Sequence, residues 1–466
     1  MAHSALAAAL LALALALPAA AAPKAAATKA AASKAARTKA FPFPFESVKL
    51  PNGLTVVLVP FDSPGLAAYY TLVRVGSRNE PEAGKSGFAH FFEHMMFRGT
   101  KKHPGAEFSS TMTRLGLDSN AFTSDDLTVY HFYGPAKALP TIIEYEADRF
   151  QNLEYTEAQF RTEAGAILGE YAKSASDPEQ RLSEKLAETA YTQHTYRHTT
   201  IGYLDDVKAM PEGFDYAKQF FSRYYRPDNA VVVVSGDFDR ASTLSLLKKH
   251  YGGWKGKAKL AAVPKEPPQK EARRASVEWA SPTLPRLWLA WHTPAASDLK
   301  AAAAAQVLDG YLFGPTSELY QSLIIDQQTV DSMFGTYSDT RDPGLFGVLA
   351  RVKDPAKVAA VEEATLAAIA AVQKGAIDAR RMEAVRSNLK YGNILALETP
   401  RDLAVTLART AALTGDLQWL NKVYAQVDAL KAADLVAYAK KHLVDSNRTT
   451  VTLQSSAAGS KVGGGK

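Results

Sequence analysis

Three side chains that can carry out chemistry lie within five residues of one another, in the segment His90-Phe91-Phe92-Glu93-His94. On an α-helix, positions i and i+4 project from one face about one turn apart, so His90 and His94 can bind one metal ion together. Glu93 lies on the adjoining part of that face, within reach of a water molecule at the metal. The order H-x-x-E-H is the H-E-x-x-H zinc motif with its glutamate on the other side. Its requirements are unchanged: neutral imidazoles for the cation and a carboxylate that takes a proton from water.

An alternative interpretation of this segment is purely structural. The neighbouring residues have the composition of a protein core: Phe88, Phe91, Phe92, Met95 and Phe97. Two histidines in such a helix could simply be hydrogen-bonded core residues. We favour a metal site, because a buried glutamate beside two histidines is costly without a positive counter-charge.

The metal site needs a third ligand from elsewhere in the chain, because a catalytic zinc ion has three protein ligands and one open position. The chain has no cysteine, so this ligand must be a histidine or a carboxylate. The helical pattern over residues 160–171 offers Glu163 and Glu170, which lie two turns apart on one helix face. One acid could bind the metal while the other orients a ligand. In the alternative interpretation both are ordinary surface glutamates.

The composition of the chain predicts a globular protein of two domains. At 466 residues, the chain is too long for one ordinary core and fits two domains of about 200 residues. Hydrophobic residues make up 47% and charged residues 22%, which indicates a globular protein rather than a disordered one. The basic, proline-containing stretch 255–274 divides the chain into two comparable halves.

The first half contains strands and helices that can hold the metal helix. The Asn52-Gly53 turn ahead of a β-branched run is a strong strand signal, and a second apolar run closes this half. Strands are predicted within residues 48–59, 68–75, 127–133 and 229–237. Helices are predicted around the motif and at residues 139–152 and 156–174.

The second half repeats this outline loosely. Strands are predicted at residues 286–292, 347–352 and 449–453, and helices at residues 299–312, 318–327 and in several later segments. Strands and helices are mixed without strict β-α-β alternation, which favours an α+β fold. We expect two homologous halves, related by duplication, each a mixed, mainly antiparallel sheet with helices packed on one face.

The N-terminus is typical of a secretory signal. An Ala/Leu run from Ala5 to Leu17 is followed by Pro18 and by small residues up to Ala22, as before an A-x-A cleavage site. The run is too short for a membrane span, although the absence of Lys and Arg before it leaves an uncleaved anchor as the alternative. We therefore predict a signal peptide at 1–22, a periplasmic or secreted location, and no stable membrane span after cleavage.

The remaining boundaries follow from composition and charge. Residues 23–41 are an Ala/Lys-rich spacer and residues 460–466 a flexible tail. Between them we predict an N-terminal zinc-binding domain at 42–254, a linker at 255–274 and a homologous, non-catalytic C-terminal domain at 275–459. The spacer, linker and tail carry a net charge of +12 in a chain of +6, so the rest of the chain carries −6. This distribution argues against a structured nucleic-acid-binding face and for attraction of basic peptides.

Further motifs surround the metal segment in the first half: Pro51-Asn52-Gly53-Leu54, Met95-Met96-Phe97-Arg98-Gly99-Thr100, Asn120-Ala121-Phe122-Thr123-Ser124, Glu146-Ala147-Asp148-Arg149, the Glu163/Glu170 pair, His198-Thr199-Thr200-Ile201-Gly202 and Tyr225-Arg226-Pro227-Asp228-Asn229-Ala230. With these motifs the chain resembles the pitrilysin/insulinase family of zinc metallopeptidases. The resemblance is to the short-chain branch that includes the mitochondrial processing peptidase subunits and their bacterial relatives. It covers the first half densely and in order, and the second half more diffusely.

The resemblance implies an α+β peptidase with one zinc ion per chain. His90, His94 and Glu170 would bind the zinc ion. Glu93 would be the general base, and Glu163 a supporting acid. The role of the base follows from its chemistry, since a carboxylate beside the metal can take a proton from water and pass it to the leaving amine.

The resemblance also implies how substrate is held. Asn120 and Ala121 would lie on an edge strand that pairs with an extended peptide substrate. Active members of the family also use an Arg and a Tyr seven residues apart, from the C-terminal half or from a partner subunit, to hold substrate and the developing oxyanion. Our alignment places Ile325 and Ser332 at these positions, and an isoleucine cannot donate a hydrogen bond.

We therefore expect a zinc-dependent endopeptidase that hydrolyses oligopeptides or unfolded polypeptide segments. The poor Arg/Tyr positions predict that the chain is the zinc-bearing subunit of a heterodimer. The homologous partner would lack H-x-x-E-H and supply the Arg/Tyr pair, and a homodimer is the alternative. A second functional class is a non-catalytic peptide-binding or assembly subunit with a vestigial zinc site.

Overall fold

The computed structural model describes residues 39–456. The predicted signal peptide at 1–22 and the predicted tail at 460–466 lie outside the described residues, as does the predicted spacer up to residue 38. Of the last spacer residues, Ala40 and Phe41 are buried in the folded chain.

The first half is built on a six-stranded sheet with the order β1-β2-β6-β3-β5-β4. Its strands are β1 (Glu46–Lys49), β2 (Thr55–Pro60), β3 (Leu66–Val73), β4 (Asp118–Thr123), β5 (Thr128–Pro135) and β6 (Ala230–Gly236). The strands β2 and β6 are parallel, and the other neighbouring strands are antiparallel. Among the described strands, β4 pairs only with β5 and therefore forms one edge of the sheet.

The second half is built on a five-stranded sheet with the order β7-β11-β8-β10-β9. Its strands are β7 (Arg273–Trp279), β8 (Arg286–Thr293), β9 (Val330–Gly335), β10 (Gly344–Val352) and β11 (Arg448–Ser455). The strands β7 and β11 are parallel, and the remaining pairs are antiparallel. This is the order and orientation of β2-β6-β3-β5-β4, so the prediction of two similar α+β halves is confirmed.

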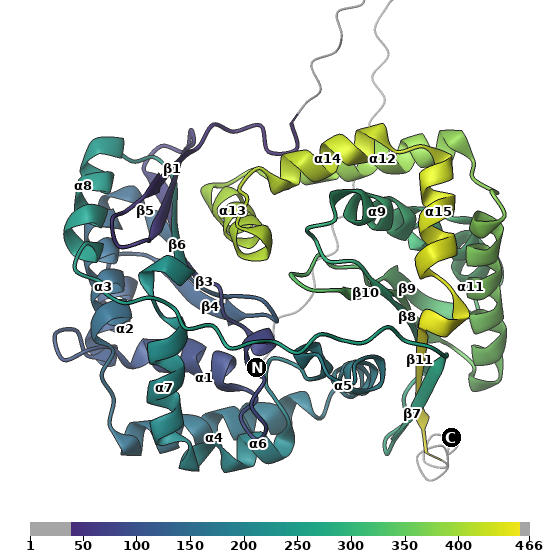
Figure 1. The fold of residues 1–466 in the computed structure, drawn as a ribbon, viewed down its shortest axis with the longest axis horizontal. Coiled ribbons are helices and arrows are strands. Elements are labelled where there is room, and N and C mark those ends of the chain that lie inside the picture. Colours follow the sequence, from purple (N-terminus) through teal and green to yellow (C-terminus); the bar gives the residue numbers. More distant parts are fainter. Residues whose placement is uncertain (1–38, 457–466) are drawn as a thin grey trace, which may run out of the picture. The chain divides into compact units, whose positions relative to one another are not determined.

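Helices follow the strands in a similar order in the two halves (Figure 1). Those of the first half are α1 (Phe88–Met95), α2 (Gly105–Arg114), α3 (Leu139–Asn152), α4 (Glu157–Ser174), α5 (Pro178–Ala190), α6 (Leu204–Ala209), α7 (Phe214–Tyr224) and α8 (Arg240–Tyr251). Those of the second half are α9 (Leu299–Phe313), α10 (Glu318–Tyr320), α11 (Val358–Gln373), α12 (Ala379–Leu395), α13 (Pro400–Thr414), α14 (Trp419–Ala429) and α15 (Ala432–His442).

The position of the central strand β6 explains its continuous valine run. All seven of its residues are buried, because both faces of the sheet are covered. Val232 and Val234 belong to the core that contains α1, α3 and α4. Val231 and Val233 face the opposite way, into a core that contains Leu403, Leu407 and other residues of α13.

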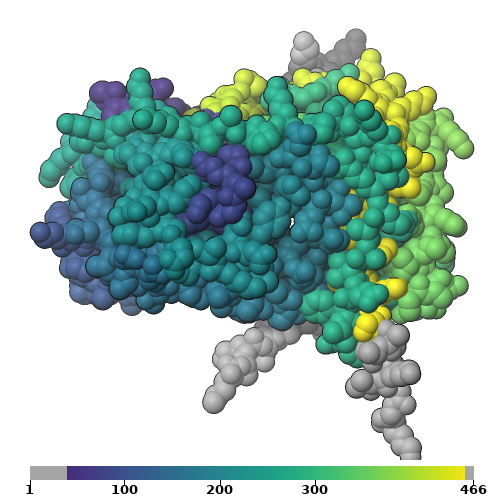
Figure 2. Space-filling view, turned by 60° about the horizontal axis from the view of Figure 1, so that its bottom comes forward, coloured from purple at the N-terminus to yellow at the C-terminus, as the bar shows by residue number. Residues whose placement is uncertain are grey.

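The two halves exchange one helix each. α13, from the second half, packs on β3 and β6 of the first sheet, and α5, from the first half, packs on β7 and β11 of the second (Figure 1). Leu182 and Leu186 of α5 lie in a core with Val451 and Leu453. On the face shown in Figure 2, the blue and teal surface of the first half lies directly against the green and yellow surface of the second. The predicted helix layer on one face of each sheet is therefore joined by a helix on the other face, which comes from the other half.

The predicted linker at 255–274 is an extended segment that ends in β7. It is bound to the first half, because the Glu266 carboxylate accepts hydrogen bonds from the backbone amides of Thr192, Gln193 and His194 at 2.8–3.0 Å. No helix among the described residues is both long and apolar enough to cross a membrane.

Candidate metal centre

The short helix α1 presents two different faces. Its apolar side chains, Phe88, Phe91, Phe92 and Met95, are at most 1% exposed and lie in the core of the first half. His90, Glu93 and His94 lie on the other face and are only partly buried. The apolar spacing therefore fixes how α1 is rotated, and this rotation directs all three polar side chains of the motif toward α4 and β4.

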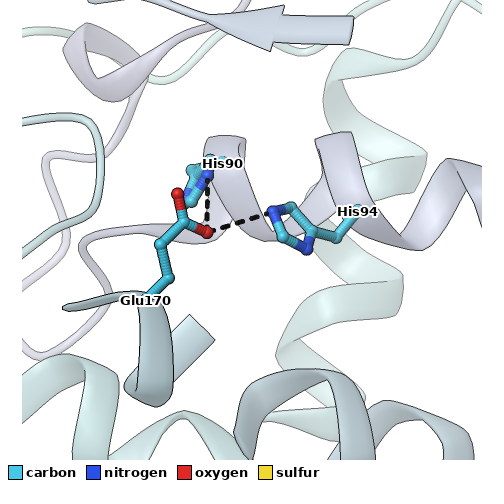
Figure 3. A group of neighbouring side chains, drawn as sticks. All are labelled: His90, His94 and Glu170. Atoms are coloured by element: carbon cyan, nitrogen blue, oxygen red, sulfur yellow. Dashed lines mark ion pairs between the residues drawn. The ribbon is translucent and has the colours of Figure 1, made fainter. Parts of the chain in front are cut away.

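α4 brings Glu170 to the two histidines (Figure 3). Glu170 Oε2 lies 3.7 Å from His90 Nε2 and 3.4 Å from His94 Nε2. One potential ligand atom from each of the three residues lies within 4.8 Å of the others. No other group of three His, Asp or Glu side chains meets this criterion within residues 39–456.

The donor set fits a zinc ion. A tetrahedral zinc ion with metal–ligand distances of about 2.0–2.2 Å separates its ligand atoms by roughly 3.3–3.6 Å, close to the distances from Glu170 to the histidines. Two imidazoles and one carboxylate form a ligand set of catalytic zinc sites, which leave one position open. Burial, and then the neighbouring His94, lower the pKa of His90 to about 4, so this imidazole is neutral at neutral pH, as a metal ligand must be.

Glu163 lies behind His94 rather than beside Glu170. Its Oε1 accepts a hydrogen bond from His94 Nδ1 at 2.9 Å, which leaves His94 Nε2 directed toward Glu170. Its second oxygen forms an ion pair with Arg98, and its side chain is 6% exposed. Glu163 is thus a buried acid, whereas the Glu170 side chain is 43% exposed.

Glu93 approaches the site from the side of β4. Thr123 Oγ1, at the end of that strand, donates a hydrogen bond to Glu93 Oε2 at 2.7 Å. Burial raises the pKa of Glu93, and the hydrogen bond from Thr123 opposes this effect. One carboxylate oxygen is thereby fixed in place.

The edge strand β4 and a cavity of about 700 Å³ adjoin these side chains. The cavity is lined by Glu93, His94, Asn120 and Glu163, together with residues of α2 and the segment before it. The backbone amide of Ala121 donates a hydrogen bond to the side-chain oxygen Oδ1 of the preceding residue, Asn120, at 2.9 Å. The structure therefore brings the edge predicted at Asn120 and Ala121 next to the histidines.

The predicted Arg and Tyr positions lie in the second half. The expected helix at 318–327 is α10 followed by a π-helix at Gln321–Asp326. Ile325 is on this π-helix and is 53% exposed, and Ser332 is on the edge strand β9.

Sequence reasoning missed the roles of two residues that contact the supporting acid and the base. Arg98 pairs with Glu163, and Thr123 bonds Glu93. Both residues belong to sequence motifs that contain other candidate residues, but the sequence does not show which side chains they contact. Only the packing of α1 against α4 and β4 brings them together.

Family models match most of the folded chain. The model described as Insulinase (Peptidase family M16) matches residues 62–203, which include every residue of the candidate site. The model described as Peptidase M16 inactive domain matches residues 214–389.

Curated relatives carry peptidase names. The chain is 32% identical over 415 residues to the zinc protease PqqE of Helicobacter pylori, covering 88% of this chain and 92% of that protein. It is 31% identical over 180 residues to human mitochondrial-processing peptidase subunit beta, covering 39% of this chain and 36% of that protein.

Solved structures share the fold. A protease from Helicobacter pylori superposes with a TM-score of 0.83 at 32% identity, covering 88% of this chain and 99% of that one. The first half of the periplasmic protease PqqL from Escherichia coli superposes with a TM-score of 0.73 at 21% identity, covering 90% of this chain and 93% of that one.

Proposed function

Because the chain belongs to the insulinase family (peptidase family M16), we propose that it is a zinc endopeptidase acting on oligopeptides or unfolded polypeptide segments. One observation carries this proposal: His90, His94 and Glu170 converge on a single point, and Glu93 lies beside them. The name of the relative from Helicobacter pylori, a zinc protease, supports the same metal and reaction class.

His90, His94 and Glu170 would hold the zinc ion, one per chain. When bound, the ion would polarise the scissile carbonyl and lower the pKa of the attacking water. Glu163 holds the His94 imidazole through Nδ1, which keeps Nε2 free for the metal. Arg98 balances the buried charge of Glu163.

Glu93 acts as the general base in this proposal. It takes a proton from the attacking water and passes it to the leaving amine. The hydrogen bond from Thr123 fixes one of its carboxylate oxygens and leaves the other free for this transfer.

An extended peptide substrate would pair with the open edge of β4. The amide of Ala121, which donates to Asn120 in the free protein, would then donate to a substrate carbonyl. The adjoining cavity has room for a substrate side chain next to the metal centre.

The zinc-bearing chain would act with a homologous subunit. Ile325 and Ser332 cannot replace an Arg and a Tyr, so the substrate and oxyanion contacts expected from those residues would come from a partner. A second copy of this chain has the same residues, which favours a heterodimer over a homodimer. A periplasmic location fits the predicted signal and the name of the structural neighbour PqqL.

The alternative of a vestigial site is less well supported. A site that had lost its function would be expected to lack at least one member of its set, and all members are present here. The word "inactive" describes the model that matches residues 214–389, which contain none of the candidate site.

The deciding experiment is a hydrolysis assay on a basic, unfolded peptide, with the chain alone and with its co-encoded homologue. We expect activity only in the mixture, and a fall in kcat of about 10²–10⁴-fold for Glu93→Gln at unchanged zinc content. Glu157→Gln, at an exposed position on α4, is the matched control. Undiminished hydrolysis by Glu93→Gln would contradict the proposed base, and full activity of the isolated chain would contradict the heterodimer.

A further inference from the structure

The metal helix α1 begins without a cap of its own. The N-cap residue is Gly87, whose φ of +91° lies in the left-handed region that favours glycine. A Cβ at this position would lie 2.6 Å from the carbonyl oxygen of Ile201. The usual capping residues, Ser, Thr, Asp and Asn, are therefore excluded from the position where they stabilise a helix.

A remote carboxylate takes over this role. Glu80 is 3% exposed and lies seven residues before the N-cap. Its Oε2 accepts a hydrogen bond from the Gly87 amide at 2.8 Å, and its Oε1 accepts one from the Ala89 amide at 2.6 Å. The two oxygens of this side chain satisfy two free amides of the first turn.

The two histidines of α1 differ in how their rings are held. His94 donates from Nδ1 to Glu163, as metal-bound histidines usually do to a carboxylate or carbonyl. His90 Nδ1 is buried and has no hydrogen-bond partner among the described residues. The orientation of His90 must therefore come from its backbone and from packing, and its backbone directly follows the amide that Glu80 binds.

We infer that Glu80 is a positioning residue for the metal centre, which places His90 by fixing the first turn of α1. The inference rests on the proposed function in so far as His90 is a zinc ligand. It requires no contact between Glu80 and substrate or metal, since Glu80 acts through the amides of Gly87 and Ala89.

Two motifs without a role in the proposed reaction complete this arrangement. The segment His198-Thr199-Thr200-Ile201-Gly202 packs against the same helix end, where a Cβ on Gly202 would lie 2.8 Å from the Gly87 nitrogen. At the other end of α1, Tyr130 donates to the Phe92 carbonyl at 3.1 Å and shares a hydrogen bond with Tyr225 at 2.8 Å. An eight-residue helix held at both ends has little freedom to shift either histidine.

The test compares Glu80→Gln and Glu80→Asp with the wild-type chain. A glutamine has one acceptor oxygen for two amides, and an aspartate is one methylene too short to reach both. We expect zinc affinity, measured by competition with a chromophoric chelator, to fall about 10–100-fold. The visible spectrum of the cobalt-substituted chain should change as well, because it reports ligand geometry. In the mixture with the homologous subunit, kcat should fall with little change in KM.

Asp298→Ala is the matched control, because Asp298 caps α9, the counterpart of α1 in the second half, by accepting from the Ala301 amide at 3.0 Å. It should lower the melting temperature of the metal-free chain and leave zinc affinity unchanged. Folded Glu80 variants with wild-type zinc affinity and cobalt spectrum would overturn the inference, as would failure of both variants to fold. Absence of zinc binding by the wild-type chain would instead overturn the proposed function.

Discussion

Glu163 differs from the other acids around the histidines, because it is buried and contacts two basic side chains, His94 and Arg98. It accepts a hydrogen bond from His94 Nδ1 and forms an ion pair with Arg98, so its negative charge stabilises both contacts. A neutral side chain there would leave Arg98 without its counter-charge and His94 with a weaker acceptor. The cost of losing one partner of such a pair exceeds that of a surface ion pair.

We expect Glu163→Gln to lower zinc affinity by about 10–100-fold and to lower kcat, while the chain remains folded. Chelator competition and a thermal melt separate the two effects. Glu157→Gln on the same helix should change neither quantity, because Glu157 is exposed and pairs with Arg161, away from the histidines. Equal zinc affinity of wild type and Glu163→Gln would show that the hydrogen bond to His94 is dispensable.

Residue spacing predicted which side chains come together, but it did not predict the different roles of the two acids. Two acids seven residues apart on one helix face are equivalent by periodicity, and only the family resemblance separated Glu170 from Glu163. In the structure the difference is burial and reach: Glu170 meets both Nε2 atoms, and Glu163 meets Nδ1 of one ring. Glu80 had no such signal, because the contact that makes it important is with backbone amides.

At the scale of elements, β4 is the part of the site that must remain open. It is an edge strand, and within residues 39–456 its Ala121 amide is occupied only by the adjacent Asn120 side chain. An exposed edge is a template for another strand, and a self-bonded asparagine lowers its tendency to pair with unwanted chains. A peptide substrate can replace that one hydrogen bond at little cost.

Proline at position 121 tests this pairing, because it removes the amide and is tolerated on edge strands. We expect Ala121→Pro to raise KM up to about tenfold with unchanged zinc content, because the loss of one hydrogen bond to substrate costs up to about 1.5 kcal/mol. Asn120→Ala keeps the backbone amide and frees it, so it should leave KM unchanged or lower it. Peptide kinetics on the two variants, with zinc measured in parallel, check both outcomes, and equal KM values would exclude pairing through this amide.

The strands β2, β3, β5, β6, β8 and β10 and the helices α3, α4 and α9 could be predicted, because their apolar residues match their local burial. The helices α2 and α5 to α8 and the strands β7 and β9 were not predicted. The exchange of α5 and α13 could not be predicted, since an amphipathic helix does not encode which sheet it covers. Leu403 and Leu407 could pack equally well on a sheet of either half, judged by their sequence. In the structure they pack on the face of the first sheet that the helices of the first half leave uncovered. The π-helix at Gln321–Asp326 was likewise invisible, because its composition is that of an α-helix.

At the scale of the whole molecule, the halves are also joined by a partly buried polar contact. Asp342, before β10, accepts hydrogen bonds from Arg78 Nε at 2.6 Å and from His194 Nε2 at 2.9 Å, and both donors belong to the first half. His194 Nδ1 accepts from the Tyr196 amide at 3.0 Å, which leaves Nε2 as the ring nitrogen that donates to Asp342. Because the exchanged helices and this contact join the two halves, we expect the halves to unfold together.

Asp342→Asn tests how much this contact contributes to stability. Burial raises the pKa of Asp342, but its hydrogen bonds with His194 and Arg78 outweigh burial and hold the pKa well below its usual range. A carboxyl with a depressed pKa stabilises the fold above its unfolded-state pKa, and this contribution is lost as the pH falls through the folded-state value. We therefore expect Asp342→Asn to lower the free energy of unfolding by about 1–3 kcal/mol at pH 7. The difference from wild type should shrink once the pH falls below about 4.

Denaturant unfolding of both proteins at pH 7 and at pH 3 measures this difference, with Asp205→Asn as a control at a site whose side chain is 95% exposed. Unfolding should remain a single transition in each case, because α5 and α13 tie each sheet to the other half. A second transition in Asp342→Asn would show that the exchanged helices alone do not couple the halves. A difference that stayed constant down to pH 3 would mean that the carboxylate charge of Asp342 is not what stabilises the contact.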